Sequence, residues 1–67
     1  MTHYVFVFRD IGNKNRSVTA EGYTARDALQ SLLESDLDGH MQELTLDRMF
    51  LREGNSLILL NKAMVLH

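Results

Sequence analysis

The stretch that decides the fold is Thr24 to Glu34, which reads TARDALQSLLE. Its apolar residues recur at i, i+3, i+4, i+7 and i+8, a spacing that places them on one side of an α-helix; they are Ala25, Ala28, Leu29, Leu32 and Leu33. Thr24 and Asp27 form an acidic variant of the capping box, in which the hydroxyl accepts from a free backbone N–H at the helix start. Gly39 supplies the stop signal. The pattern therefore predicts one amphipathic helix with its apolar side toward a core.

Two β-strands are predicted before this helix. His3 to Arg9 (HYVFVFR) is rich in aromatic and β-branched residues and is apolar on both faces. Ser17 to Tyr23 alternates in a way that favours a strand with one exposed face, at or near the edge of a sheet. The polar stretch Asp10 to Arg16 between them is typical of a hairpin connection.

The segment Met41 to Arg52 is open to two interpretations. A strand is favoured because Gly54-Asn55 lies between two apolar runs, as in a tight hairpin, with Ser56 to Leu60 as the partner strand. In that strand the side chains of Leu44, Leu46 and Phe50 point to the same face. The alternative is a helix lined by Met41, Leu44 and Leu51.

The expected fold class follows from this order of elements. The chain is predicted to be a single α+β domain, residues 1–67, in the order ββαββ, with one amphipathic helix packed on an antiparallel or mixed sheet. The sheet has four strands, or five if a turn at Asn61-Lys62 breaks the last apolar run in two.

Composition excludes several classes of protein. The chain has no cysteine, which removes disulfides, thiolate zinc sites and cysteine nucleophiles. No apolar run approaches the roughly 20 residues of a membrane span, and the first residues lack the pattern of a secretory signal. A cytoplasmic protein without membrane contact is expected. With 67 residues the core is small, so stability must come from packing or from oligomerisation.

No catalytic or cofactor constellation is found. The three histidines, His3, His40 and His67, lie far apart and lack metal-ligand spacing. The run Asp36 to His40 lacks most ligands of a calcium loop, and the glycines occur singly rather than in a phosphate-binding loop. Neither enzyme activity nor a cofactor or metal is expected.

Charge is unevenly distributed although the net value is only -2. Between Glu34 and Asp47 there are acidic residues and no Lys or Arg. Such a run is either a solvated helix end and loop or an acidic surface that meets a basic partner. The residues proposed to contact a protein partner electrostatically are Asp36, Asp38, Glu43 and Asp47.

One helix covers only one face of a sheet, yet His3 to Arg9 and Leu57 to Leu60 are apolar on both faces. The other face needs a second helix, a second copy of the chain or a different protein, because large exposed apolar patches mark interaction sites. A homodimer formed by sheet packing is the first choice, since two-fold dimers are the commonest oligomers. The residues chosen for this face are Val5, Val7, Ile58 and Leu60.

Nucleic-acid binding is the second functional class. The hairpin tip is basic, and a two-stranded ribbon can enter a major groove, twice in a dimer. The residues that would carry it are Arg9, Lys14 and Arg16. The negative net charge and the absence of a continuous basic stripe weigh against it.

The run Ser17 to Glu34 (SVTAEGYTARDALQSLLE) is similar to the strand-to-helix passage of HicB-type antitoxins and of small phage- or plasmid-borne proteins. The likeness covers about a quarter of the chain, and the glycine- and proline-containing loop and DNA-binding segment of those antitoxins have no counterpart here. This resemblance implies an antitoxin-like regulator. For the fold, a β-grasp is a further possibility with the element order ββαβ. The preferred hypothesis is a small non-enzymatic protein-binding module, adaptor- or inhibitor-like.

Overall fold

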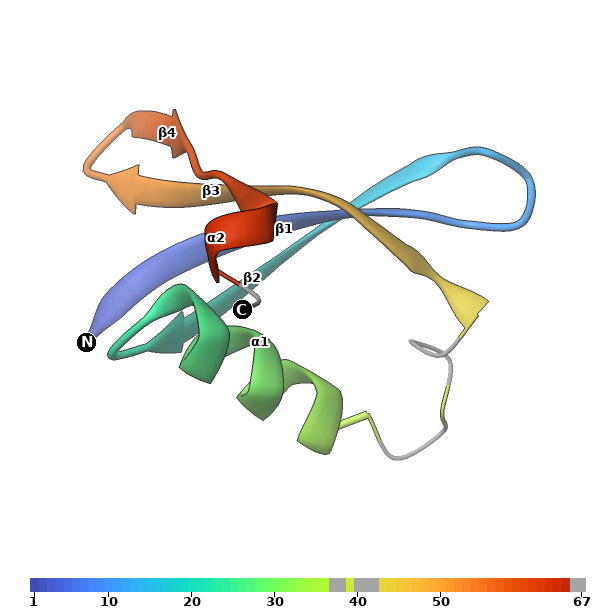
Figure 1. Cartoon of the computed structure of the whole chain (residues 1–67), viewed down its shortest axis with the longest axis horizontal. Helices are drawn as coiled ribbons and strands as arrows, with labels where there is room; N and C mark the ends of the chain where they lie inside the picture. Colours follow the sequence, from blue (N-terminus) through green and yellow to red (C-terminus); the bar gives the residue numbers. More distant parts are fainter. Residues whose placement is uncertain (37–38, 40–42, 66–67) are drawn as a thin grey trace.

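The fold is α+β, with a helix on a four-stranded antiparallel sheet (Figure 1). The computed structural model describes residues 1–36, 39 and 43–65. The strand order in the sheet is β2-β1-β3-β4. In chain order the elements are β1 (Thr2–Arg9), β2 (Asn15–Gly22), α1 (Ala25–Glu34), β3 (Thr45–Glu53), β4 (Ser56–Leu59) and α2 (Lys62–Val65).

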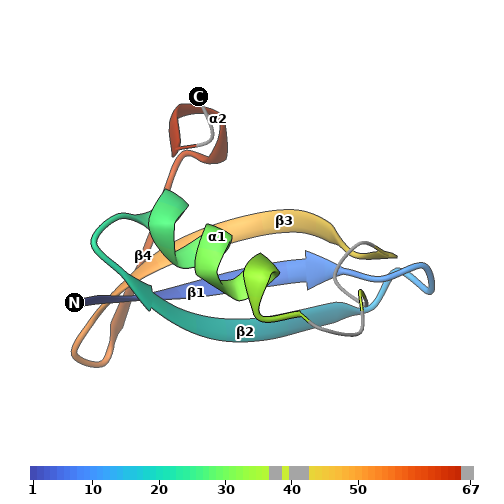
Figure 2. The ribbon, with the colours of Figure 1, turned by 90° about the horizontal axis from the view of Figure 1, so that it is seen from below.

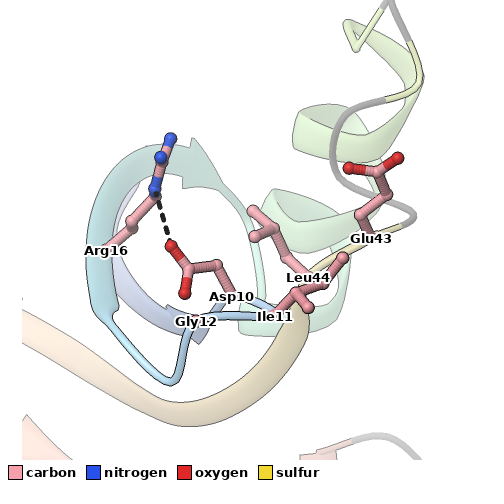
Figure 3. Close-up of a pocket in the computed structure, with 6 residues that line it drawn as sticks. All are labelled: Asp10, Ile11, Gly12, Arg16, Glu43 and Leu44. Carbon is pink, nitrogen blue, oxygen red and sulfur yellow. Dashed lines mark ion pairs between the residues drawn. The ribbon is translucent and has the colours of Figure 1, made fainter.

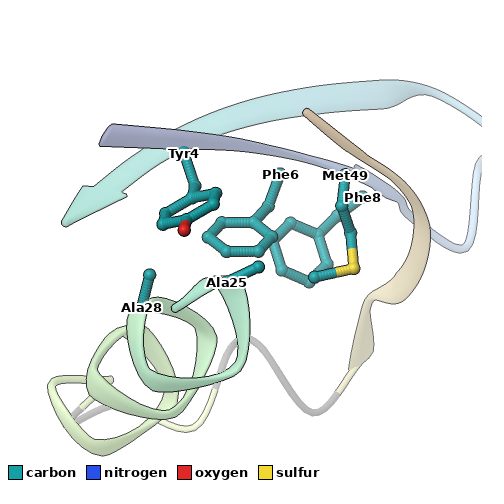
Figure 4. Packing of buried hydrophobic residues seen from close by; sticks show 6 residues of the cluster. All are labelled: Tyr4, Phe6, Phe8, Ala25, Ala28 and Met49. Atoms are coloured by element: carbon teal, nitrogen blue, oxygen red, sulfur yellow. The ribbon is translucent and has the colours of Figure 1, made fainter. Parts of the chain in front are cut away.

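β1 lies at the centre of the sheet, between β2 and β3. Its residues Tyr4, Phe6 and Phe8 point toward α1 and are buried, and they make up most of the core with Met49 of β3 (Figure 4). The edge position predicted for β2 is confirmed by the strand order.

The predicted helix cap is confirmed. Thr24 Oγ1 accepts a hydrogen bond from the Asp27 backbone N–H (3.1 Å). The helix ends at Glu34, before Gly39, which has a φ of 71°. The predicted apolar stripe is buried only in part: Ala25 and Ala28 are buried, Leu29 and Leu32 are partly buried against the core, and Leu33 is 48% exposed.

Gly22, the last residue of β2, brings that strand into close contact with α1. A Cβ placed on it would lie 2.6 Å from the Ala28 backbone nitrogen. Because no side chain fits in that space, glycine is required here for the close approach of strand and helix.

A strand rather than a helix in the segment after α1 is confirmed for Thr45–Glu53. The prediction that Leu46 and Phe50 point to the same face of this strand was wrong. Val7 pairs with Arg48 while Phe8 pairs with Leu46, so Asp47 is an extra residue, a β-bulge. Leu46 therefore shares the α1 side with Met49, and Phe50 faces the opposite way.

The predicted tight hairpin at Gly54-Asn55 is confirmed, because Glu53 pairs with Ser56 across it. Of its two loop residues Gly54 alone has a positive φ (58°), the pattern of a type II′ turn.

Of the two predicted strand counts, four is confirmed for the described residues. The alternative of a fifth strand after Asn61 is wrong, because residues 62–65 form the helical turn α2. The Asn61 side-chain oxygen accepts from the Ala63 N–H, and its carbonyl oxygen accepts from Met64 and Val65. Asparagine in this position starts a helical turn. Lys62 Nζ also donates to the Leu46 carbonyl oxygen (2.8 Å), which ties α2 to β3.

Candidate binding surface

The two faces of the sheet differ in what covers them. α1 lies in front of β1 and β2 in Figure 2, and Val65 of α2 packs against the same core. No element of the part of the chain that the structure describes packs on the opposite face, here called the open face. Its apolar strip consists of Val5, Val7, Phe50, Leu57 and Leu59.

The register places these side chains next to one another. Val5 pairs with Phe50, and Phe50 pairs with Leu59, so the strip crosses from β1 to the free edge at β4. Residues directly opposite in antiparallel strands point to the same face. Val5, Val7 and Phe50 are half-buried, whereas Leu59 is 62% exposed. The strip is therefore most accessible at β4.

Charged side chains border the apolar strip. The bulge places the Asp47 carboxylate between two guanidinium groups, 3.2 Å from Arg9 and 3.4 Å from Arg48. Arg52 extends the row of cations along β3, and its Nε donates to the Gly54 carbonyl oxygen (3.2 Å). On the same face, beside Arg52, His3 Nδ1 of β1 lies 3.4 Å from Glu21 of β2. The margin of the strip along β3 is thus mainly basic.

The apolar residues selected from the sequence do not share one face. Val5 and Val7 lie on the open face as predicted. Ile58 pairs with Leu51 on the α1 side, and Leu60, whose N–H donates to the Met49 carbonyl oxygen, packs against the core on that side. That grouping was wrong because the face on which a β4 residue lies depends on how β4 pairs with β3, and the sequence analysis did not determine this pairing.

Three residues of the strip were missed by the sequence analysis: Phe50, Leu57 and Leu59. The two-residue loop of the β3–β4 hairpin was the signal that could have identified them. Once the loop is confined to two residues, Glu53 pairs with Ser56, and counting outward sets Phe50 opposite Leu59.

The four acidic residues selected from the sequence have different surroundings. Asp47 is neutralised by Arg9 and Arg48, while Glu43 is exposed beside a hollow near Arg16. Asp36 is half-buried, and Asp38 lies outside the described residues.

The β1–β2 hairpin tip holds the residues proposed for nucleic-acid binding. Asp10 organises the tip: its carbonyl oxygen accepts from Asn13, which has a φ of 64°, and its side chain accepts from the Lys14 backbone N–H (2.9 Å). The same carboxylate lies 3.7 Å from Arg16 (Figure 3). Arg9 and Arg16 are thus paired with acids, and Lys14 is exposed at the turn.

The hollow beside this tip is shallow, with a volume of about 280 Å³ (Figure 3). Its lining combines exposed Ile11 with Leu44, Glu43 and the Asp10–Arg16 pair. Among the described residues that line the hollow, no nucleophile lies beside a base.

Within residues 1–36, 39 and 43–65, no three His, Asp or Glu side chains lie together in a way that could hold a metal ion. Among the same residues, no helix has the length and apolar character needed to cross a membrane.

Comparison with models of known protein families, with curated proteins and with solved structures gives no match for this chain.

Proposed function

We propose that this chain is a small protein-binding module without catalytic activity, and that the open face is its binding surface. The observation that carries the proposal is how little apolar surface the chain buries by itself. Among the described residues six hydrophobic side chains are buried, of which two are alanines, while eight large ones are exposed, and two of these eight, Leu57 and Leu59, belong to the strip. Burial of apolar surface is the main driving force of association, so the uncovered strip favours a partner.

The charges around the strip indicate what the partner surface looks like. Arg48 and Arg52 lie on either side of Phe50 along β3, and Arg9 follows Val7 on β1, with Asp47 offsetting part of their charge. A partner with an apolar ridge flanked by carboxylates is complementary to this arrangement. An adaptor- or inhibitor-like role and a cytoplasmic location belong to the same proposal. The acidic run contributes less to it, because Asp47 already has two basic partners.

Affinity capture from the source cells tests this proposal. The baits are the tagged wild type, Phe50→Glu, which places a charge in the strip, and Arg48→Glu, which reverses a margin charge and leaves the core intact. The matched control is Leu33→Glu, because Leu33 is a similarly apolar, 48% exposed residue on α1. Circular dichroism establishes that each bait is folded.

The proposal expects a protein in stoichiometric amount with the wild type and with Leu33→Glu. The two open-face variants should lose it at least about tenfold, which corresponds to about 1.4 kcal/mol of binding free energy. Retention of the same proteins by all four baits, or by none, would refute the open face as a binding surface.

Nucleic-acid binding remains the alternative prediction. The ion pairs of Arg9 and Arg16 reduce the positive charge that the hairpin tip can offer to phosphates.

A further inference from the structure

We propose that the free edge of β4 pairs in antiparallel fashion with β4 of a second copy of this chain, so that two four-stranded sheets join into one. The dimer is a separate inference from the open-face partner and does not depend on it. It concerns the edge of the sheet, where backbone groups as well as side chains lack a partner.

The first observation is the direction of the backbone groups in β4. Antiparallel strands alternate hydrogen-bonded and non-hydrogen-bonded pairs, and a two-residue hairpin loop is closed by a hydrogen-bonded pair, here Glu53 and Ser56. The next hydrogen-bonded residue is Ile58, and the Leu60 N–H, which donates to the Met49 carbonyl oxygen (2.9 Å), continues the alternation. The N–H and C=O groups of Leu57 and Leu59 therefore point away from β3.

The second observation is the lack of protection along this edge. Three consecutive large side chains are exposed in the described structure: Leu57 by 54%, Ile58 by 43% and Leu59 by 62%. Natural edge strands are usually blunted by charged side chains, proline, a bulge or a very short length, and of these β4 has only its short length of four residues. β4 (SLIL) has no charge and no proline. Outward backbone groups between exposed apolar side chains are complementary to another β-strand.

The third observation selects a second copy as that strand. The sequence Leu57-Ile58-Leu59 reads the same in both directions. With a two-fold axis at Ile58, Leu57 lies opposite Leu59 of the partner subunit, and Leu59 opposite Leu57 of the partner subunit. These are the residues whose backbone groups point outward, so they form the hydrogen-bonded pairs. The outward-pointing backbone groups and the symmetric side-chain sequence thus favour the same pairing register.

This register places the two apolar strips on one continuous surface. Leu57 and Leu59 of each copy lie on the open face, so the strip of one subunit continues into that of the other. A two-fold dimer of this kind presents two copies of the open face on the same side.

The register also makes a cross-linking test specific. Ile58 is opposite Ile58 of the partner subunit at a non-hydrogen-bonded pair, where Cα atoms are about 4.5 Å apart, within the roughly 4.4–6.8 Å that a disulfide spans. The chain has no cysteine of its own. Ile58→Cys is compared with Leu57→Cys, one residue away, and with Tyr23→Cys, an 81% exposed residue outside β4.

Under mild oxidation Ile58→Cys should form a disulfide-linked dimer at least about tenfold faster than either control, because the pairing holds its two thiols at bonding distance. Light scattering of the wild type should give a mass near twice 7.7 kDa. Leu57→Lys combined with Leu59→Lys should reduce it to the mass of one chain.

The edge pairing would be overturned by equal cross-linking rates for the three cysteine variants, or by a wild-type mass of one chain at the highest concentration. A dimer that resists the double lysine variant but dissociates with Phe50→Glu would instead be a face-to-face dimer and would also overturn it. The capture experiment reports separately on the open-face partner, so failure of one proposal is distinguishable from failure of the other.

Discussion

The two edge strands of this sheet, β2 and β4, differ in length, in charge and in whether a helix lies against them. β2 has eight residues, is mostly polar, and carries Arg16 and Glu21. At its end Gly22 is in contact with Ala28, so α1 lies against it. β4 has four residues, no charge and exposed leucines. One edge thus carries charged residues and a covering helix, whereas the other has neither, and this difference is the reason why we propose β4 as the pairing edge.

The largest effect is expected where β2 meets α1. Gly22→Ala places a methyl group 2.6 Å from the Ala28 backbone nitrogen, so helix and strand must separate. Overpacking of this kind costs about 1–3 kcal/mol of the free energy of unfolding. Urea denaturation measures it. Gly12→Ala is the matched control, because its added methyl group would meet only Asp10 Oδ1 at 3.4 Å, and it should be nearly neutral. Equal midpoints for the two variants would mean that α1 does not hold the β2 edge.

A smaller effect is expected at the start of α1. Thr24→Ala removes the oxygen that accepts from the Asp27 N–H, and loss of such a cap costs about 1 kcal/mol. The same denaturation experiment measures it, and Thr24→Ser, which keeps the hydroxyl, should recover most of the loss. If serine is as destabilising as alanine, the methyl group rather than the hydrogen bond is responsible, and the cap does not anchor the helix beside β2.

The smallest effect on the stability of a single chain is expected at β4. Leu57→Lys with Leu59→Lys alters exposed side chains, which usually changes the free energy of unfolding by less than about 0.5 kcal/mol. The concentration dependence of Tm is what should change. For the wild type Tm should rise with protein concentration, because association stabilises the folded state, and for the variant it should be constant. Equal concentration dependence in both would remove the functional contrast between the two edges.

Local signals in the sequence were enough for much of the fold. β1 could be recognised from HYVFVFR, the helix start from Thr24, and the second hairpin from Gly54-Asn55, because each depends on residues within a few positions. α2 could not be predicted, since its start depends on Asn61 capping a turn and on Lys62 reaching the Leu46 carbonyl oxygen of β3.

The candidate site was predictable to a smaller extent. Val5 and Val7 were identified, but Ile58 and Leu60 face α1, because which side a strand residue occupies depends on pairing with a distant segment. Phe50 was misplaced because the bulge at Asp47 shifts the alternation by one residue. The same bulge brings Asp47 between two arginines, which a count of acidic residues along the chain does not reveal.

Because β1 lies in the middle of the sheet, its two neighbouring strands are synthesised at different times. Its first neighbour, β2, starts at Asn15, but its second neighbour, β3, starts only at Thr45, 36 residues after Arg9. At ribosomal rates of about 5–20 residues per second, synthesis of β3 begins roughly 2–7 s after β1 is complete. During that interval one side of YVFVF has no strand beside it in the nascent chain. The pairing of β1 with β3 therefore completes the centre of the sheet late in synthesis, after the β1–β2 hairpin is available.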